Sequence, residues 1–288
     1  KLQQQVCQKY GWSADYGSTE DGHWYVDVTI GLGDKRRYSA TEKQAKKKAK
    51  ETVSAIALQE LETDIQHEES KPVKELSQVF SAQLTIFDSS DAATWEMFWK
   101  NPPKIVGIDT EGNQTSPPIL AQISTDDYTI LEVSKHNTIS TNLQRLLDDD
   151  NIIKVFCDNF SHSDKKCLGI TITEDANFMK PPIIDLECLA STLLGPVNTA
   201  RGLSKLVTIS MPELNVRILK PKIQQGQLRG RYTNVARFVL IEQGKVAPLR
   251  GLSDLSNKEQ QYAALDSRCT LQAYHRIQQY NDTMSMSE

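Results

Sequence analysis

Runs of apolar residues separated by polar loops outline a small module within residues 1–61. Three strands are predicted from runs that include aromatic and β-branched residues, at 12–16, 24–31 and 35–39. A short helix is predicted before them, from Leu2 to Lys9, and a long helix after them, from Thr41 onward. The expected order is therefore helix, three strands, helix.

A second series of apolar runs begins after residues 62–79, a polar, lysine- and glutamate-rich stretch that is typical of a linker. Strands are predicted at Lys104–Ile108 and Ile152–Phe156. A helix is predicted around Lys258–Asp266, with Ser256-Asn257 as its cap. These elements predict a larger domain over residues 80–288.

Acidic residues follow several of these elements. Asp109 and Glu111 stand two apart at the end of a predicted strand, so both point to the same face. Tyr262 and Asp266 stand four apart on a predicted helix and also share a face. Asp164 follows another strand. Several converging carboxylates can hold two divalent ions about 3.5–4 Å apart, flanking both oxygens of a phosphoryl displacement.

In this order, the fragments resemble the tyrosine-bearing branch of the DEDD 3′-5′ exonucleases, which includes RNase D and Werner-type enzymes. The resemblance covers roughly residues 80–280, and Gln261-Tyr262-Ala263-Ala264-Leu265-Asp266 is its most specific part. It implies an RNase H-like mixed sheet and two ions, Mg²⁺ or Mn²⁺. The implied ligands are Asp109, Glu111, Asp164 and Asp266. Tyr262 would orient the attacking water, and the products would be nucleoside 5′-monophosphates.

Two departures from the family pattern leave alternatives open. The stretch before Asp164 is a residue or two longer than usual, so Asp158 is a rival for that ligand position. His162 is interpreted as a histidine of a loop or helix surface and not as a general base, because this branch uses tyrosine for that role. Residues 211–251 form an insertion with eight basic and two acidic residues, a net charge of +6. Such an insertion can line the path of a polyanion; its candidate residues are Arg229, Arg231 and Arg237.

The long helix of the first module carries lysines on one side. Lys43, Lys46, Lys47 and Lys50 fall within an arc of about 100°, displaced from the apolar stripe that contains Ala49 and Val53. With the helix, three strands, helix order, this resembles a double-stranded RNA-binding domain covering residues 1–61. The resemblance implies an α-β-β-β-α fold and phosphate contacts from Lys46, Lys47 and Lys50. It also implies minor-groove contacts from His23 and Gln5.

Composition sets further limits on the 288-residue chain. Its formal net charge is −4, with 24% charged and 39% hydrophobic residues, as in globular proteins. No apolar run has the length of a membrane span. The five scattered cysteines indicate free thiols in a reducing, intracellular compartment, cytoplasm or nucleus. The chain starts at Lys1 inside a predicted helix, which indicates a piece of a longer protein.

The combined hypothesis is an α/β (α+β) exoribonuclease that acts on double-stranded or structured RNA with a 3′ end. Protein partners stay undefined at this point. Three alternatives remain open: a DNA exonuclease of the Werner type, an inactive RNA-binding adaptor, and a first module that binds protein. The presence of all four carboxylates together with Tyr262 disfavours the adaptor.

Overall fold

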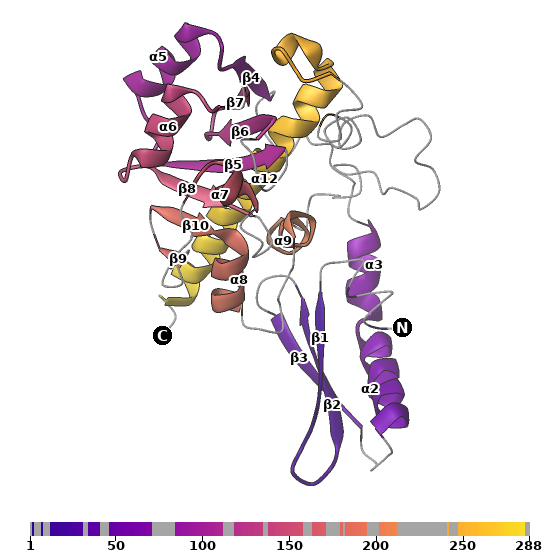
Figure 1. Cartoon of the computed structure of the whole chain (residues 1–288). Helices are drawn as coiled ribbons and strands as arrows, with labels where there is room; N and C mark the ends of the chain where they lie inside the picture. Colours follow the sequence, from indigo (N-terminus) through magenta and orange to yellow (C-terminus); the bar gives the residue numbers. More distant parts are fainter. Residues whose placement is uncertain are drawn as a thin grey trace.

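A computed structural model gives the fold of the chain (Figure 1). It describes residues 12–30, 34–40, 46–70, 84–111, 118–134, 138–157, 163–170, 179–180, 182–194, 202–211 and 247–285, together with Leu2, Cys7 and Ile241. The described residues form an N-terminal module and a larger α/β part.

The N-terminal module is a three-stranded antiparallel sheet covered by a helix. The sheet has the order β1-β2-β3, with β1 at Ser13–Ser18, β2 at Trp24–Ile30 and β3 at Asp34–Ser39. Helix α2 (Lys46–Glu60) packs on it through Ala49, Val53 and Ala57, which are fully buried. The three predicted strands and the body of the long helix are thereby confirmed. Most of the predicted first helix lies outside the described residues, although Leu2 and Cys7 belong to this core.

The first part of the predicted linker is helical. Helix α3 (Glu62–Ser70) follows α2 directly, and its Ile65 packs against the core of the module. Asp64 accepts a 2.6 Å hydrogen bond from Arg36 of β3. Residues 71–83 lie outside the described part of the chain. The N-terminal core therefore extends a few residues beyond the predicted boundary at residue 61.

The larger part is built on a seven-stranded mixed sheet. Its order is β4-β7-β6-β5-β8-β10-β9. At the centre of the sheet, β5 pairs with β6 in antiparallel orientation and with β8 in parallel orientation. The strands are β4 (Thr85–Asp88), β5 (Ile105–Glu111), β6 (Leu120–Ser124), β7 (Tyr128–Val133), β8 (Ile153–Phe156), β9 (Met179–Lys180) and β10 (Ile183–Asp185).

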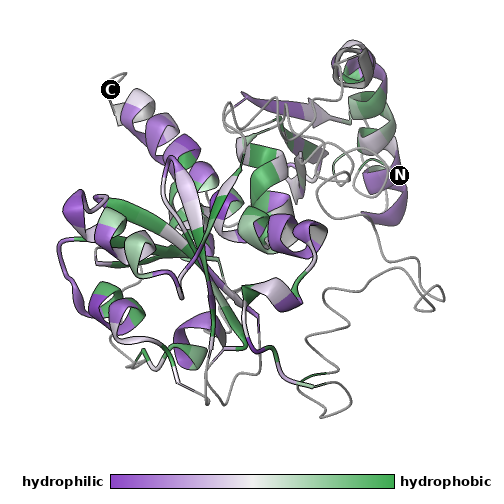
Figure 2. Cartoon of the chain, turned by 90° about the horizontal axis from the view of Figure 1, so that it is seen from above, coloured by the Kyte–Doolittle hydropathy of each residue, from purple (hydrophilic) through white to green (hydrophobic). Residues whose placement is uncertain are grey.

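Helices cover both faces of this sheet. On one face, α5 (Ala92–Lys100) and α6 (Thr141–Asp148) pack against Val106 and Ile108 of β5. On the other lie α8 (Leu186–Leu194), α9 (Leu203–Ser210) and the long α12 (Asn257–Ser285). Figure 2 shows hydrophobic residues gathered along the strands and polar residues on the outer helix surfaces. The even-numbered positions of β5 face α5 and α6, so the odd-numbered ones face α12.

No helix in the described ranges is both long enough and apolar enough to span a bilayer.

Candidate active site

Three of the predicted ligands meet where β5 ends and α12 crosses it. Oxygen atoms of Asp109, Glu111 and Asp266 all lie within 4.8 Å of one another. Asp266 is 7% exposed, while Asp109 and Glu111 are partly buried at the strand end. Carboxylate oxygens are the hard ligands that Mg²⁺ and Mn²⁺ prefer. The donor set therefore fits a divalent cation.

A glycine brings the helix close enough to complete this cluster. Gly107 lies on β5, two residues before Asp109 and on the same face. A Cβ atom at Gly107 would come within 2.3 Å of the main-chain oxygen of Ser267, the residue after Asp266. Only glycine permits this approach of α12 to the strand. The contact carries Asp266 toward the strand end that bears the other two carboxylates.

The start of α12 is fixed by a reciprocal cap. The main-chain nitrogen of Ser256 donates to Glu259 at 2.7 Å, and the nitrogen of Glu259 donates to the Ser256 hydroxyl at 3.3 Å. This capping box satisfies two donors at the first turn and confirms the predicted cap. Tyr262 lies in α12, one turn before Asp266, but its side chain is outside the described part of the structure.

Asp164 approaches the same strand end from the opposite side. It lies on α7 (Ser163–Cys167) and is 7% exposed. The Thr110 hydroxyl, between the two β5 ligands, donates a 2.6 Å hydrogen bond to Asp164 Oδ1. Thr110 points away from the face that carries Asp109 and Glu111. Three of the predicted ligands therefore lie together, and the fourth, Asp164, is hydrogen-bonded to Thr110, which stands between Asp109 and Glu111.

Burial perturbs the Asp164 carboxyl. Desolvation raises its pKa to about 6, and the hydrogen bond from Thr110 opposes that rise. Asp185 raises the pKa further by charge repulsion, whereas the ammonium group of Lys165 lowers it. Burial therefore makes the charged form of Asp164 costlier than in water, and a nearby cation offsets this cost.

A buried ion pair lies beside Asp164. Lys165 Nζ donates to Asp185 Oδ2 at 2.8 Å, and both side chains are 0% exposed. The other oxygen of Asp185 accepts the main-chain N–H groups of Glu187 at 2.9 Å and Cys188 at 3.3 Å, at the start of α8. Charges buried this deeply need such partners. The pair joins α7 to β10 and α8.

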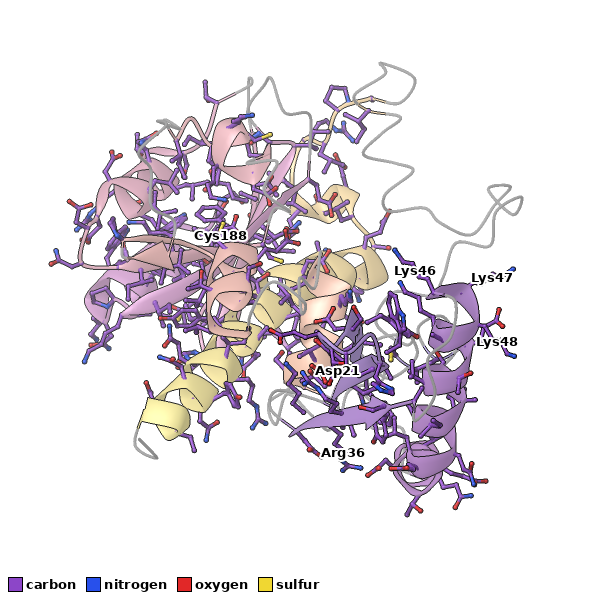
Figure 3. The ribbon with its side chains drawn as sticks, turned by 90° about the horizontal axis from the view of Figure 1, so that it is seen from below. Asp21, Arg36, Lys46, Lys47, Lys48 and Cys188 are labelled. Atoms are coloured by element: carbon purple, nitrogen blue, oxygen red, sulfur yellow. The ribbon has the colours of Figure 1, made fainter. Side chains whose placement is uncertain are left out.

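The N-terminal module presents lysines at the first turn of α2 (Figure 3). Lys46 and Lys47 are exposed, and Lys50 is partly buried. Lys50 Nζ lies 5.0 Å from the centroid of the Tyr16 ring and 5.9 Å from that of Trp24. Lys46 Nζ lies 6.0 Å from the Trp24 ring. The aromatic rings of the sheet therefore support the ammonium groups from one side.

His23 directly precedes Trp24 and is partly buried. Its loop closes through the N–H of Thr19, which donates to the His23 carbonyl at 2.8 Å. Gly22 has φ +80° in this turn, a conformation that favours glycine. Since the ammonium groups of Lys46 and Lys50 lie 6.0 and 5.9 Å from the centroid of the Trp24 ring, His23 and these lysines lie at the same end of the module.

The other predicted positions fall outside the described residues: Gln5, Asp158, His162, Arg229, Arg231 and Arg237. Reading the sequence did not single out Thr110, Lys165, Asp185 or Gln122 as parts of the site. The position of Thr110 between two predicted ligands is the one feature of the sequence that could have marked it as part of the site. The others are joined to the site only by contacts between distant segments.

Comparison with known proteins identifies the family of the chain. The sequence matches the 3′-5′ exonuclease family over residues 84–280. None of the curated proteins matches the chain. The EXO domain of Nibbler from Aedes aegypti is 14% identical, with 70% of this chain and 93% of that chain covered and a TM-score of 0.40.

Two further solved structures are similar at low identity. The catalytic core of RRP6 from Trypanosoma brucei is 17% identical, with 75% of this chain and 51% of that chain covered and a TM-score of 0.43. The EXD2 exonuclease domain soaked in Mn and dGMP is 16% identical, with 71% and 95% covered and a TM-score of 0.27. The family assignment rests on the sequence match, which spans most of the chain and includes the carboxylate cluster. The chain belongs to the 3′-5′ exonuclease family and is a metal-dependent nuclease.

Proposed function

We propose that this protein is a 3′-5′ exoribonuclease that degrades double-stranded or structured RNA and releases nucleoside 5′-monophosphates. The observation that carries the proposal is the meeting of Asp109, Glu111 and Asp266 within 4.8 Å, in a chain that also carries a lysine-bearing module. The first feature supports hydrolysis of a phosphodiester. The second supports duplex RNA as the substrate.

Asp109, Glu111, Asp164 and Asp266 would hold two divalent ions, Mg²⁺ or Mn²⁺. When bound, such ions stabilise charge on the attacking and leaving oxygens of a phosphoryl displacement. The protein's own residues keep the ligands in place. Gly107 lets Asp266 approach, and Thr110 holds Asp164 Oδ1.

Tyr262 would position the attacking water. A phenol has a pKa near 10, so at neutral pH it serves as a hydrogen-bond partner and not as a base. The place of Tyr262 one turn before Asp266 on α12 supports this role, because residues four apart on a helix share a face.

The N-terminal module would grip the duplex without reading its sequence. Lys46, Lys47 and Lys50 would contact phosphates, and His23 and Gln5 would contact minor grooves, where 2′-hydroxyls distinguish RNA from DNA. The sheet-and-helix core and the lysines at the first turn of α2 support this assignment. Arg229, Arg231 and Arg237 would line the path of the strand toward the carboxylates.

Competition between substrates tests the proposal. The full chain is incubated with end-labelled RNA and DNA of one sequence, each as blunt duplex, duplex with a 3′ overhang, and single strand. We expect 5′-monophosphate release from the 3′ end, with duplex or overhang RNA degraded faster than the matching DNA. Equal or faster degradation of DNA would favour the alternative of a DNA exonuclease. Binding of RNA without product release would favour the adaptor.

A further inference from the structure

A buried amide lies next to the carboxylate cluster. Gln122, at the centre of β6, is 0% exposed. It is the cross-strand partner of Asp109 in the antiparallel β5–β6 pair. Side chains of such partners stand next to each other on the same face of the sheet, here the face that α12 covers. The amide therefore lies between a proposed ligand strand and the helix that carries Asp266.

The surroundings of Gln122 fix the orientation of its amide. Two acceptors face one end of the amide, so the nitrogen must point toward them. In this orientation Nε2 donates to Asp109 Oδ2 at 2.8 Å and to the main-chain oxygen of Ala263 at 3.2 Å. Both donor hydrogens of the amide are thereby used. Ala263 directly follows Tyr262 and stands three residues before Asp266 on α12.

We propose that Gln122 is a positioning residue for the metal site, holding Asp109 and the Ala263 turn of α12 in one fixed arrangement. The proposal depends on the role given above to Asp109 and Asp266. A ligating carboxylate that is hydrogen-bonded by the protein keeps its orientation when the ion is absent, so less ordering is needed on binding. The Gln122 amide orients Asp109 in this way, and it also donates a hydrogen bond to α12, the helix that carries Asp266.

Ser124 offers a matched control. It stands two residues further along β6 on the same face and is also fully buried. Its hydroxyl hydrogen-bonds Ser267 of α12 at 2.8 Å and Thr129 at 2.7 Å. Ser124 therefore joins the same strand to the same helix, with no hydrogen bond to Asp109. Its loss weakens the packing of α12 without releasing a carboxylate.

The test measures Mn²⁺ binding to the full chain by calorimetry, without substrate, together with the Tm of the metal-free protein. Gln122→Met keeps the length of the side chain and removes the amide. We expect its Kd for Mn²⁺ to rise about tenfold, as for other residues that orient metal ligands. Ser124→Ala should lower the Tm and leave the Kd within about twofold of wild type.

A double variant separates positioning from general damage. If Gln122 acts through Asp109, Gln122→Met should change the Kd by less than about twofold in an Asp109→Asn background. Should Gln122→Met fail to fold, Gln122→Asn replaces it, because its shorter amide no longer reaches Asp109. An unchanged Kd in the folded single variant would overturn the role of Gln122 alone. Absence of Mn²⁺ binding by the wild type would overturn the proposed metal site as well.

Discussion

The Thr110 hydroxyl donates a 2.6 Å hydrogen bond to Oδ1 of Asp164, 54 residues away in the sequence. This bond joins β5, which carries Asp109 and Glu111, to α7, which carries the fourth proposed ligand. The ligands approach from both faces of the sheet, with Asp266 on the α12 side. One threonine therefore connects the two halves of the site.

Thr110→Val should weaken both catalysis and the fold. Valine has nearly the same shape but cannot donate a hydrogen bond, so Asp164 loses a fixed partner. We expect about a tenfold loss of kcat/KM and a loss of about 1–3 kcal/mol of stability from the buried carboxyl. RNA digestion and urea denaturation measure the two effects. Thr129→Val removes a buried hydroxyl that bonds Ser124, so it should lower stability at unchanged kcat/KM.

The raised pKa of Asp164 predicts a pH dependence of stability in the metal-free protein. The pKa of this carboxyl is about 6 in the folded chain, above its ordinary value of 3.8. The folded state therefore binds more protons than the unfolded state between these values, and the stability contribution of Asp164 falls as pH rises through this window. Asp164→Asn removes that loss.

The measurement compares urea denaturation of wild type and Asp164→Asn in EDTA. Relative to the variant, the wild type should lose about 2 kcal/mol of stability between pH 4 and pH 8. Added Mn²⁺ should reduce the difference at pH 8, because a bound cation compensates the buried charge. If the stability difference between wild type and Asp164→Asn stays constant between pH 4 and pH 8, the raised pKa of a buried Asp164 is contradicted.

Gly107→Ala should separate α12 from the ligand strand. The new methyl group would meet the Ser267 main-chain oxygen at 2.3 Å and Leu271 Cβ at 2.9 Å, so the helix must shift. We expect a loss of about 1–3 kcal/mol from overpacking and at least a tenfold lower kcat/KM. Gly251→Ala is the control, since its methyl group would meet only Ser253 Oγ at 4.0 Å. Full activity of Gly107→Ala would show that the close approach is not needed.

Variants of two lysines on α2 distinguish RNA binding through specific phosphate contacts from attraction by net charge. Lys50 is a proposed phosphate contact, and its ammonium group lies near the rings of Tyr16 and Trp24. Lys48 is exposed and lies about 160° away from Lys50 around the helix axis. Lys50→Ala should weaken duplex RNA binding and reduce the salt slope of log Kd by about one. Lys48→Ala removes the same charge and should have a smaller effect. Equal effects in filter binding across a salt series would indicate attraction by net charge alone.

The local part of this site could be predicted from sequence. Asp109 and Glu111 share a face because they stand two apart on a strand, and Asp266 was recognised from its place on a helix with Tyr262. Ser256 was predicted as a cap and forms one. The shared faces follow from the period of a single strand or helix and the cap from its residue type, whereas the assignment of these carboxylates as ligands follows from the order of the fragments and the family resemblance.

The supporting contacts could not be predicted in this way. Gln122, Thr110 and the Lys165–Asp185 pair depend on the register between strands and on the crossing of α12 and α7. Polar residues in buried strands have no distinctive spacing that would mark them. Helix α3 occupies a stretch whose polar composition is typical of a linker, and the contacts of Asp64 and Ile65 with the module hold it there.

Release of nucleotides from 3′-labelled RNA by Asp266→Asn tests the central claim most directly. The wild type should release 5′-monophosphates with Mg²⁺ or Mn²⁺ and stop in EDTA. Asp266→Asn should lose at least about a hundredfold of kcat/KM, since replacing a charged carboxylate ligand by a neutral amide weakens ion binding and transition-state stabilisation. The control Asp282→Asn, exposed on the same helix, should keep full activity. A rate for Asp266→Asn within about twofold of wild type, in a folded protein, would contradict the assignment of the carboxylate cluster as the active site.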